Sequence, residues 1–477
     1  MNRSYRLVGW TCLTAFLFFS SAGAFGAPEG GRPNIVFIMS DDHATSAISA
    51  YGSKINRTPN LDRLADQGMR FENAFCTNSI CAPSRAVILT GKYSHLNGVR
   101  DNRAAFNGKQ VTFPKLLRQA GYQTTIVGKW HLKSLPTGFD YSNVLPGQGA
   151  YHNPALIEQG QTKKHTGYAT DIITNLAIEW LGRRDRRKPF CLLVQHKAPH
   201  ANWETDTKHA QMYADMKIPE PATFNDDGRG RSSAMREHQL RIGPSQWRLH
   251  YRRRFGPIPN DVPNEKVRGW VYQRYIKDYL RCVASIDDNV GRLLDHLDKT
   301  GLTQNTIVVY TSDQGFFLGE HGLYDKRFMY EPSLRMPLLV RYPKRIKAGS
   351  TTDAIALNLD FAATFLDYAG VKIPAGMQGH SLRRVLRGER PKDWRSVMYY
   401  RFYEKGYDIG PMEGVRTQRY KLIHYLYADQ AWELYDLQND PDEMRNLYSD
   451  AKHADLVERL KAQIGRLRTQ YRFNTSD

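Results

Sequence analysis

Four apolar segments of the chain, residues 34–39, 123–127, 190–195 and 306–310, each end in a cluster of polar residues. Uninterrupted apolar runs of this length are typical of strands that are buried on both faces, as in a parallel sheet. Segments with helical periodicity, such as residues 169–181, separate these runs. The alternation predicts an α/β fold in which helices cover both faces of a mostly parallel sheet.

The polar clusters carry residues that we expect to act together. Ligands of open α/β sheets bind at the carboxyl ends of the strands, so the clusters are predicted to meet in one crevice. In chain order, their candidate side chains are Asp41, Asp42, Lys129, His131, His196, His200, Asp313 and Gln314.

The acidic members of these clusters form a candidate metal site. Asp41 and Asp42 are adjacent after a buried run, where two carboxylates need a compensating charge. With Asp313 and the Gln314 carbonyl they offer hard oxygen ligands, a set that suits calcium or magnesium and not zinc.

A further segment, residues 81–91, begins Cys-Ala-Pro-Ser-Arg and continues with an apolar run. Pro83 fits the first turn of a helix, which places Cys81 at the helix N-terminus. Free amides and the helix dipole favour a bound anion at such a position. A buried structural cysteine is the alternative interpretation.

Three cations are candidates for holding a tetrahedral anion, namely Arg85, Lys129 and Lys326. They would neutralise charge that develops on the anion in the transition state. His196 and His200 flank a proline-containing turn, and either can serve as a general acid. Zinc is the other interpretation of two nearby histidines, but no cysteine or third histidine stands at zinc spacing.

The pattern changes after about residue 380, where residues 397–402, 414–417 and 420–425 read as short antiparallel strands and residues 454–468 as an amphipathic helix. We therefore expect a smaller α+β domain at the C-terminus. The predicted boundaries are 1–26 for a signal peptide, 27–380 for the catalytic domain, 202–263 for an insertion over its active-site face, and 381–477 for the C-terminal domain.

Residues 1–26 have the features of a secretory signal peptide. Arg3 and Arg6 precede an apolar run over residues 8–19, which is too short to span a bilayer and is followed by small residues. We expect an exported protein, periplasmic or secreted. No later apolar stretch is long enough for a transmembrane helix, so no stable membrane anchor is expected.

These motifs together resemble the type I sulfatases of the alkaline-phosphatase-like superfamily. The matching segments are residues 34–42, 81–91, 128–131, 196–200, 311–326 and 433–447. The resemblance implies a large mixed, mostly parallel sheet sandwiched by helices, with a smaller C-terminal α+β domain that contains an antiparallel sheet.

The resemblance also implies a nucleophile and a metal. Cys81 would be oxidised to formylglycine by a formylglycine-generating or anaerobic sulfatase-maturating enzyme, and its hydrate would attack sulfur. Asp41, Asp42, Asp313 and Gln314 would bind one ion, calcium in preference to magnesium, together with the formylglycine. Many family members carry Asn or His where this chain has Gln314, whose carbonyl offers the same oxygen on a longer arm.

The resemblance to the type I sulfatases also implies the remaining catalytic roles. Arg85 would stabilise the hydrate, and Lys129 and Lys326 would hold the sulfate oxygens. His131 would assist collapse of the sulfated intermediate, and His200 would protonate the leaving alcohol. The other histidine of that turn, His196, is the alternative acid.

The formal net charge of +19 indicates an anionic partner or a solvated basic surface. No DNA- or RNA-binding motif is present and the basic runs are scattered, which argues against nucleic acid. The resemblance implies a sulfated carbohydrate of glycosaminoglycan or mucin type, as for N-acetylglucosamine-6-sulfatases and iduronate-2-sulfatases. Candidate contacts to such a sugar are Asp101, Asn102, Arg103, Tyr403, Glu404 and Arg416.

Two other functions fit parts of the pattern. A phosphatase or phosphodiesterase on the same fold would use a Ser or Thr nucleophile and usually a second metal. A catalytically dead, polyanion-binding protein would bind sulfated glycan without releasing sulfate.

Overall fold

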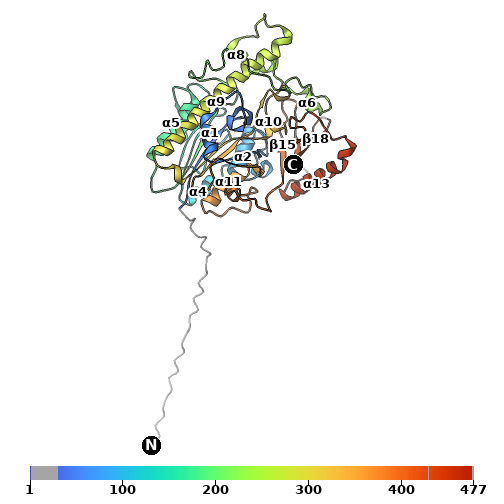
Figure 1. Ribbon diagram of the computed structural model, residues 1–477. Helices are drawn as coiled ribbons and strands as arrows, with labels where there is room; N and C mark the ends of the chain where they lie inside the picture. The colour runs from blue at the N-terminus through green and yellow to red at the C-terminus, as the bar shows by residue number, and fades with distance from the viewer. Residues whose placement is uncertain (2–30, 428, 475–477) are drawn as a thin grey trace.

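The computed structural model describes residue 1, residues 31–427 and residues 429–474 (Figure 1). The predicted signal peptide lies outside the described residues apart from Met1. Among the described residues, no helix combines the length and the apolar character that crossing a bilayer requires.

The centre of the molecule is a ten-stranded sheet with the strand order β13-β2-β12-β9-β1-β8-β4-β5-β6-β7. Its middle strands are the four predicted apolar runs, β1 (Asn34–Ser40), β4 (Gln123–Lys129), β8 (Phe190–Gln195) and β9 (Thr306–Ser312). They are parallel neighbours in the order β9-β1-β8-β4. Since parallel neighbours end at the same edge, their polar clusters lie together, as predicted.

Flanking strands make this sheet mixed. β5 (Tyr141–Leu145) is parallel to β4, whereas β12 (Leu338–Arg341) pairs antiparallel with β9. The outer strands are β2 (Met69–Phe71), β6 (Ala155–Glu158), β7 (Gln161–Lys164) and β13 (Ser350–Thr352). Two small sheets pair β3 (Ala74–Phe75) with β14 (Ala356–Leu357) and β10 (Phe317–Leu318) with β11 (Tyr324–Asp325). Sequence reasoning missed most of these short strands because they lack a long apolar run.

Helices form two groups, one on each side of the sheet (Figure 1). One group contains α1 (Pro59–Asp66), α5 (Ala169–Arg183) and α9 (Val267–Lys299). The other contains α2 (Cys81–Thr90), α4 (Phe113–Gln119) and α11 (Asp360–Tyr368), with the short helices α3 (Ser94–Asn97) and α12 (Arg383–Leu386) beside them. The predicted covering of a mostly parallel sheet by helices is confirmed.

Residues 202–263 contain three short helices, α6 (Ser233–Glu237), α7 (Pro244–His250) and α8 (Arg252–Phe255). Trp203 holds the start of this segment, because its buried ring stacks on Tyr251 at 5.8 Å and meets Tyr275 of α9 at 4.7 Å. Asp226 holds its middle by ion pairs with Arg231 at 2.5 Å and His321 at 2.7 Å.

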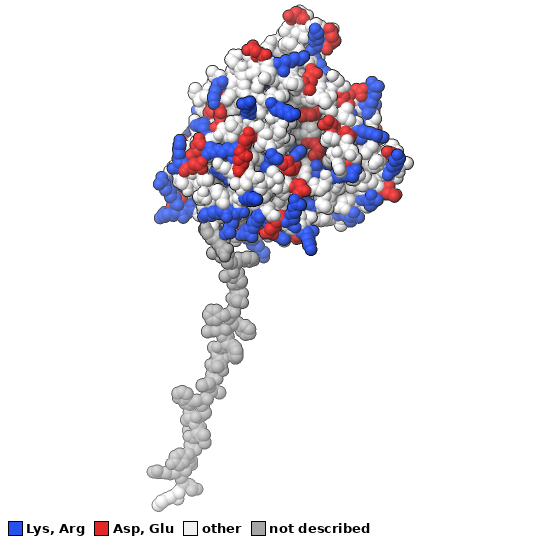
Figure 2. Space-filling model, in the orientation of Figure 1, with Lys and Arg blue, Asp and Glu red and all other residues white. Residues whose placement is uncertain are grey.

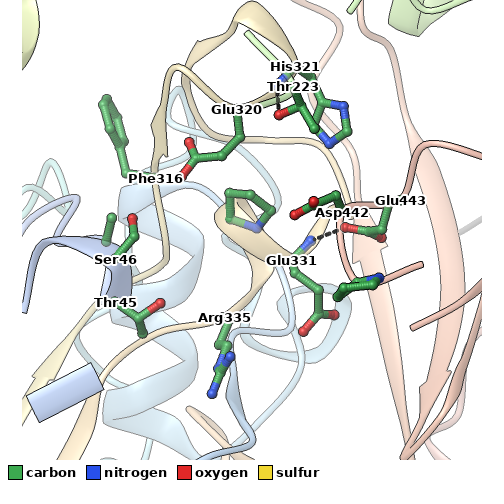
Figure 3. A pocket seen from close by; sticks show the side chains of 13 residues that line it. Thr45, Ser46, Thr223, Phe316, Glu320, His321, Glu331, Arg335, Asp442 and Glu443 are labelled. Carbon is green, nitrogen blue, oxygen red and sulfur yellow. Dashed lines mark hydrogen bonds between the residues drawn. The ribbon is translucent and has the colours of Figure 1, made fainter. Parts of the chain in front are cut away.

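A separate four-stranded antiparallel sheet follows at the C-terminus, as predicted. Its strands are β15 (Val397–Phe402), β16 (Met412–Thr417), β17 (Tyr420–Tyr425) and β18 (Trp432–Asp436), and α13 (Ala454–Gln470) packs against it. Arg416 and Lys421 of this sheet form ion pairs with Glu331 of α10 (Glu331–Leu334). Figure 3 shows Glu331 and Glu443 beside a pocket of about 170 Å³, with the Glu331 amide donating to Glu443 at 2.7 Å.

Candidate active site

The carboxyl ends of β1 and β9 position three carboxylates. Asp41 and Asp42 follow β1 directly, and Asp313 follows β9. Asp42 has a left-handed backbone with a φ of 69°, and its amide donates to Asp313 Oδ1 at 3.2 Å. The left-handed turn directs successive carboxylates into one place, and all three acids are buried.

Cys81 is the first residue of α2 and lies against these carboxylates. Its Sγ is 3.4 Å from Asp41 Oδ1, and donor atoms of Asp41, Cys81 and His200 all lie within 4.8 Å of one another. Burial and the Asp41 charge raise the pKa of the Cys81 thiol. A thiol held protonated is a poor nucleophile, so this cysteine lacks the activated character of catalytic thiolates.

Three buried cations face the three carboxylates. Lys129, at the end of β4, bonds Asp41 Oδ2, and Lys326 lies 2.6 Å from both oxygens of Asp42. Arg85 Nε donates to Asp313 Oδ2 at 3.0 Å. The cluster therefore contains three carboxylates and three cations, each cation hydrogen-bonded to a different carboxylate.

The electrostatics differ among the carboxylates. At Asp41, burial opposes ionisation, but the cations Lys129, Arg85 and Lys326 outweigh it and hold the pKa well below its usual range. Burial raises the pKa of Asp42 to about 6 in spite of Lys326, and burial together with Asp41 raises that of Asp313 to about 8. Asp42 and Asp313 are thus short of positive charge, which a cation would supply.

The residues present fit a divalent cation. Carboxylate oxygens of Asp41, Asp42 and Asp313 lie within 4.8 Å of one another. Gln314 is fully buried beside them, and its Oε1 has no hydrogen-bond partner among the described residues. Its Nε2 donates to Asp42 Oδ1 at 2.5 Å, which fixes the amide within the cluster. An orphaned carbonyl oxygen next to three carboxylates is the donor set of an oxygen-ligated metal.

The predicted histidines occupy different places. His200 Nδ1 lies 2.8 Å from the Ala201 carbonyl, and its Nε2 lies 3.8 Å from Asp42 Oδ2, so the ring faces the cluster. His196 is buried, and neither of its ring nitrogens has a hydrogen-bond partner among the described residues. Burial and the neighbouring Lys129 lower the pKa of His131 to about 2, so His131 is neutral near pH 7.

Of the predicted sugar contacts that follow α2, Asn102 lies next to the Cys81 motif. Asn102 Oδ1 accepts the Ala82 amide at 3.0 Å and so supports the first turn of α2. Asp101 accepts the amides of Arg103 and Ala104 at 2.9 and 3.0 Å, which closes the same loop. Arg103 is exposed.

The three sugar contacts predicted in the C-terminal domain lie in different surroundings. Tyr403 lies between Arg100 and Arg401, whose guanidinium carbons are 5.5 and 5.2 Å from its ring centre. Glu404 has a buried Oε2 without a hydrogen-bond partner among the described residues. Arg416 pairs with Glu331 at 3.4 Å, so the structure places it in the junction between the sheets and not with the cluster around Cys81.

Sequence reasoning missed residues that hold this cluster in place. Gln148 Oε1 accepts from Lys129 Nζ at 2.5 Å, and the Tyr279 hydroxyl donates to the Asp42 carbonyl at 2.6 Å. Ser84 Oγ donates to the Asp313 carbonyl. Gln148 lies in a loop after an unpredicted strand and Tyr279 in the middle of α9, so only Ser84, within the Cys81 motif, carried a local signal.

Comparison with protein-family models places this chain among known families. Residues 33–371 match the model described as Sulfatase, and residues 319–470 match the C-terminal model of N-sulphoglucosamine sulphohydrolase. An N-acetylglucosamine-6-O-sulfatase of Bacteroides thetaiotaomicron is 46% identical over 493 positions, covering 94% of this chain and 88% of the relative. The human N-acetylglucosamine-6-sulfatase is 29% identical over an alignment that covers 81% of this chain and 70% of the human protein.

Solved structures show the same likeness. One, described as a complex with its substrate D-glucosamine-2-N,6-O-disulfate, matches with a TM-score of 0.89 and 45% identity, covering 93% of this chain and 99% of that one. A phosphonate monoester hydrolase of Agrobacterium radiobacter matches with a TM-score of 0.76 at 21% identity, over 92% of this chain and 96% of that one. At 21% identity, the match to the phosphonate monoester hydrolase shows a shared fold and nothing more.

Proposed function

The chain belongs to the sulfatase family and is a sulfuric ester hydrolase, and we propose that it removes the 6-O-sulfate from a glucosamine or N-acetylglucosamine unit of a sulfated glycan. The observation that carries the proposal is the burial of Cys81 among three carboxylates and three cations, at the edge where four parallel strands end. The 6-O-sulfated amino sugar comes from the names of the relatives that are 46% and 45% identical.

Cys81 supports this proposal as a precursor rather than as a thiol nucleophile. Burial raises its pKa, so the thiolate is disfavoured. We propose that Cys81 is converted to formylglycine by a maturation enzyme, and that the hydrated aldehyde supplies the attacking hydroxyl. That hydroxyl would occupy the place of Sγ, within reach of Asp41 and His200.

Asp41, Asp42, Asp313 and Gln314 would hold one calcium ion, which supplies a positive charge that orients and polarises the nucleophile. Calcium is proposed over magnesium because it accepts a flexible set of carboxylate and carbonyl oxygens without keeping most of its water. Arg85 bonds Asp313 and the Lys129 carbonyl, so it fixes α2 relative to the ligands.

Lys129 and Lys326 would bind the sulfate oxygens and stabilise the charge that they gain in the transition state. Both ammonium groups are buried and aimed at the cluster, so little reorganisation is needed. His200 would protonate the leaving sugar oxygen through Nε2, because Nδ1 donates to the Ala201 carbonyl. This step needs the doubly protonated ring; burial and Lys129 lower the pKa of His200 in the free enzyme, and the negative charge of a bound sulfate would raise it again. His131, neutral and beside Lys129, would accept a proton when sulfate is released.

Export completes the proposal, since a basic start and an apolar run at residues 1–26 are typical of a signal peptide. Maturation would take place before or during export, by a separate enzyme in the same host.

The test combines mass spectrometry with substrate comparison. Protein co-expressed with a maturation enzyme should carry an aldehyde or its hydrate at Cys81. It should then release sulfate from N-acetylglucosamine-6-sulfate faster than from the 3-sulfate or from galactosamine-6-sulfate. Preferential hydrolysis of N-acetylglucosamine-6-phosphate would indicate a phosphatase instead, and tight binding to sulfated glycan without release of sulfate would indicate a dead site.

A further inference from the structure

Residues 241–255 contain five arginines and no carboxylate. We call these residues the arginine segment, which includes α7 and α8. Figure 2 shows Lys and Arg interspersed with Asp and Glu over the visible face. Many exposed arginines are paired accordingly, as Arg118 is with Asp140 at 2.6 Å and Arg384 with Glu389 at 2.9 Å.

Three members of the arginine segment are different. Arg248, Arg252 and Arg253 are exposed, and within the described part of the chain their side chains make no hydrogen bond, ion pair or ring contact. Unpaired guanidinium groups on one short segment repel each other unless an anion lies between them. The guanidinium fork matches the oxygens of a sulfate or carboxylate group.

The segment also presents exposed apolar side chains. Phe255 is 44% exposed and Leu249 is 55% exposed. The Phe255 ring is held by the guanidinium groups of Arg274 at 3.9 Å and Arg254 at 5.0 Å. An aromatic ring fixed among cations gives an anionic carbohydrate an apolar face as well as charges to contact.

The position of the arginine segment connects it with the leaving group. His250 Nδ1 lies 2.9 Å from Asn202 Oδ1, and Arg254 donates to the Asn202 carbonyl at 2.6 Å. Asn202 stands two residues after His200, whose Nε2 is proposed to protonate the departing sugar oxygen. The ring of His250 also lies 5.5 Å from that of Tyr324, two residues before Lys326.

From these contacts we infer that the arginine segment is a second anion-binding surface on the leaving-group side of the active site, which binds sulfate or carboxylate groups further along the same glycan chain. The inference rests on the proposed function for its substrate class. It makes the natural substrate an oligosaccharide or polymer with several anionic groups, and not a free monosaccharide sulfate.

The decisive variant replaces Arg248, Arg252 and Arg253 with Gln. A matched control, Arg186→Gln with Arg187→Gln and Lys188→Gln, removes the same three charges from an exposed loop that precedes β8, at the opposite edge of the sheet. Both variants lose only exposed side chains, and thermal unfolding would verify that each is folded.

Kinetics should separate the two surfaces. For a 6-O-sulfated heparin-derived tetrasaccharide, the first variant should lose about tenfold in kcat/KM through a higher KM, as expected for three exposed charge contacts of up to about 0.5 kcal/mol each. For N-acetylglucosamine-6-sulfate it should retain the wild-type kcat/KM, and the control should match the wild type on both. An equal loss on both substrates, or the same loss in the control, would overturn the inference.

A binding measurement keeps the inference separate from the catalytic proposal. Unmatured protein, which carries the Cys81 thiol, would be eluted from immobilised heparin with a salt gradient. The Arg248, Arg252 and Arg253 variant should elute at lower salt than the control of equal net charge. Coincident elution would refute the surface, whereas different elution without any sulfatase activity would leave the surface supported and the proposed reaction wrong.

Discussion

Two of the buried clusters of opposite charges differ in how completely their groups are bonded, one around Cys81 and the other where the C-terminal sheet meets α10. In the junction, Glu331 pairs with Arg416 at 3.4 Å and with Lys421 at 2.8 Å, and Glu443 pairs with Lys421 at 2.6 Å. The remaining Glu443 oxygen accepts the Glu331 amide. Each of the four carboxylate oxygens therefore has a donor from within the protein.

The Cys81 cluster has a similar composition but incomplete bonding. The Gln314 Oε1 is orphaned, whereas burial raises a carboxyl pKa in both clusters, at Asp42 and Asp313 here and at Glu443 in the junction. Buried charges that satisfy each other stabilise an interface, whereas buried groups left without partners indicate a place for a ligand. Both clusters carry buried charges. The Cys81 cluster differs from the junction because one of its buried polar atoms lacks a hydrogen-bond partner.

The largest effect should follow from changing the nucleophile position. Cys81→Ala should lower kcat for sulfate release by at least about a thousandfold, because covalent catalysis is lost while binding is kept. The melting temperature should change little. Cys191→Ala, at the second residue of β8, is a control that removes an equally buried thiol and should keep the wild-type kcat. Substantial turnover by Cys81→Ala would show that another group attacks sulfur.

Breaking the junction should give the opposite result. Lys421→Met leaves Glu331 and Glu443 buried without their shared cation, which should cost about 3–5 kcal/mol of unfolding free energy. Denaturant titration measures this loss, and kcat of the folded fraction should be preserved. Lys326→Met is the matched change in the Cys81 cluster and should lower kcat more than stability. If both variants lose activity and stability to the same extent, the proposed division between the clusters is wrong.

Removing the metal should cause the next largest loss of activity. A chelator should lower activity by at least about a hundredfold, since a bound cation contributes several kcal/mol to stabilising the transition state. Calcium added at a hundred times its Kd should raise the unfolding free energy by about 2.7 kcal/mol. Gln314→Ala should weaken calcium binding, whereas Gln148→Ala, which removes a partner of Lys129, should not. Full activity in excess chelator would contradict the metal site.

Much of this architecture was predictable because it depends on local pattern. The apolar runs at β1, β4, β8 and β9 identified the central strands, and strand ends in a parallel sheet must meet at one edge. Arg416 shows the limit of local pattern, since a buried arginine in an ion pair has the same sequence signature as one that binds substrate, and its role as a sugar contact stays a prediction. Its partner Glu331 is 85 residues away, and only the folded chain brings the two together.

A smaller effect should appear at low pH. Burial opposes ionisation of Asp226, but His321 and Arg231 outweigh it and hold its pKa below the value of about 3.9 expected when unfolded. A depressed native pKa contributes stability above pH 4 that is lost as the pH falls below it. Asp226→Asn should therefore have a lower melting temperature than the wild type at pH 7, and the gap should narrow towards pH 3. Asp261→Asn, an exposed carboxyl of the same segment, should show no such gap.

The smallest change tests whether Asn102 supports the helix or contacts sugar. Asn102 Oδ1 accepts the Ala82 amide at 3.0 Å, one residue after Cys81, so Asn102→Ala should destabilise the protein by about 1 kcal/mol through loss of this cap. Because the cap fixes the first turn of α2, kcat should fall while KM for N-acetylglucosamine-6-sulfate stays constant. Asn102→Asp keeps an accepting oxygen and should restore stability. A raised KM without loss of stability would instead assign Asn102 to the sugar, and would extend the ligand-binding cluster beyond the residues around Cys81.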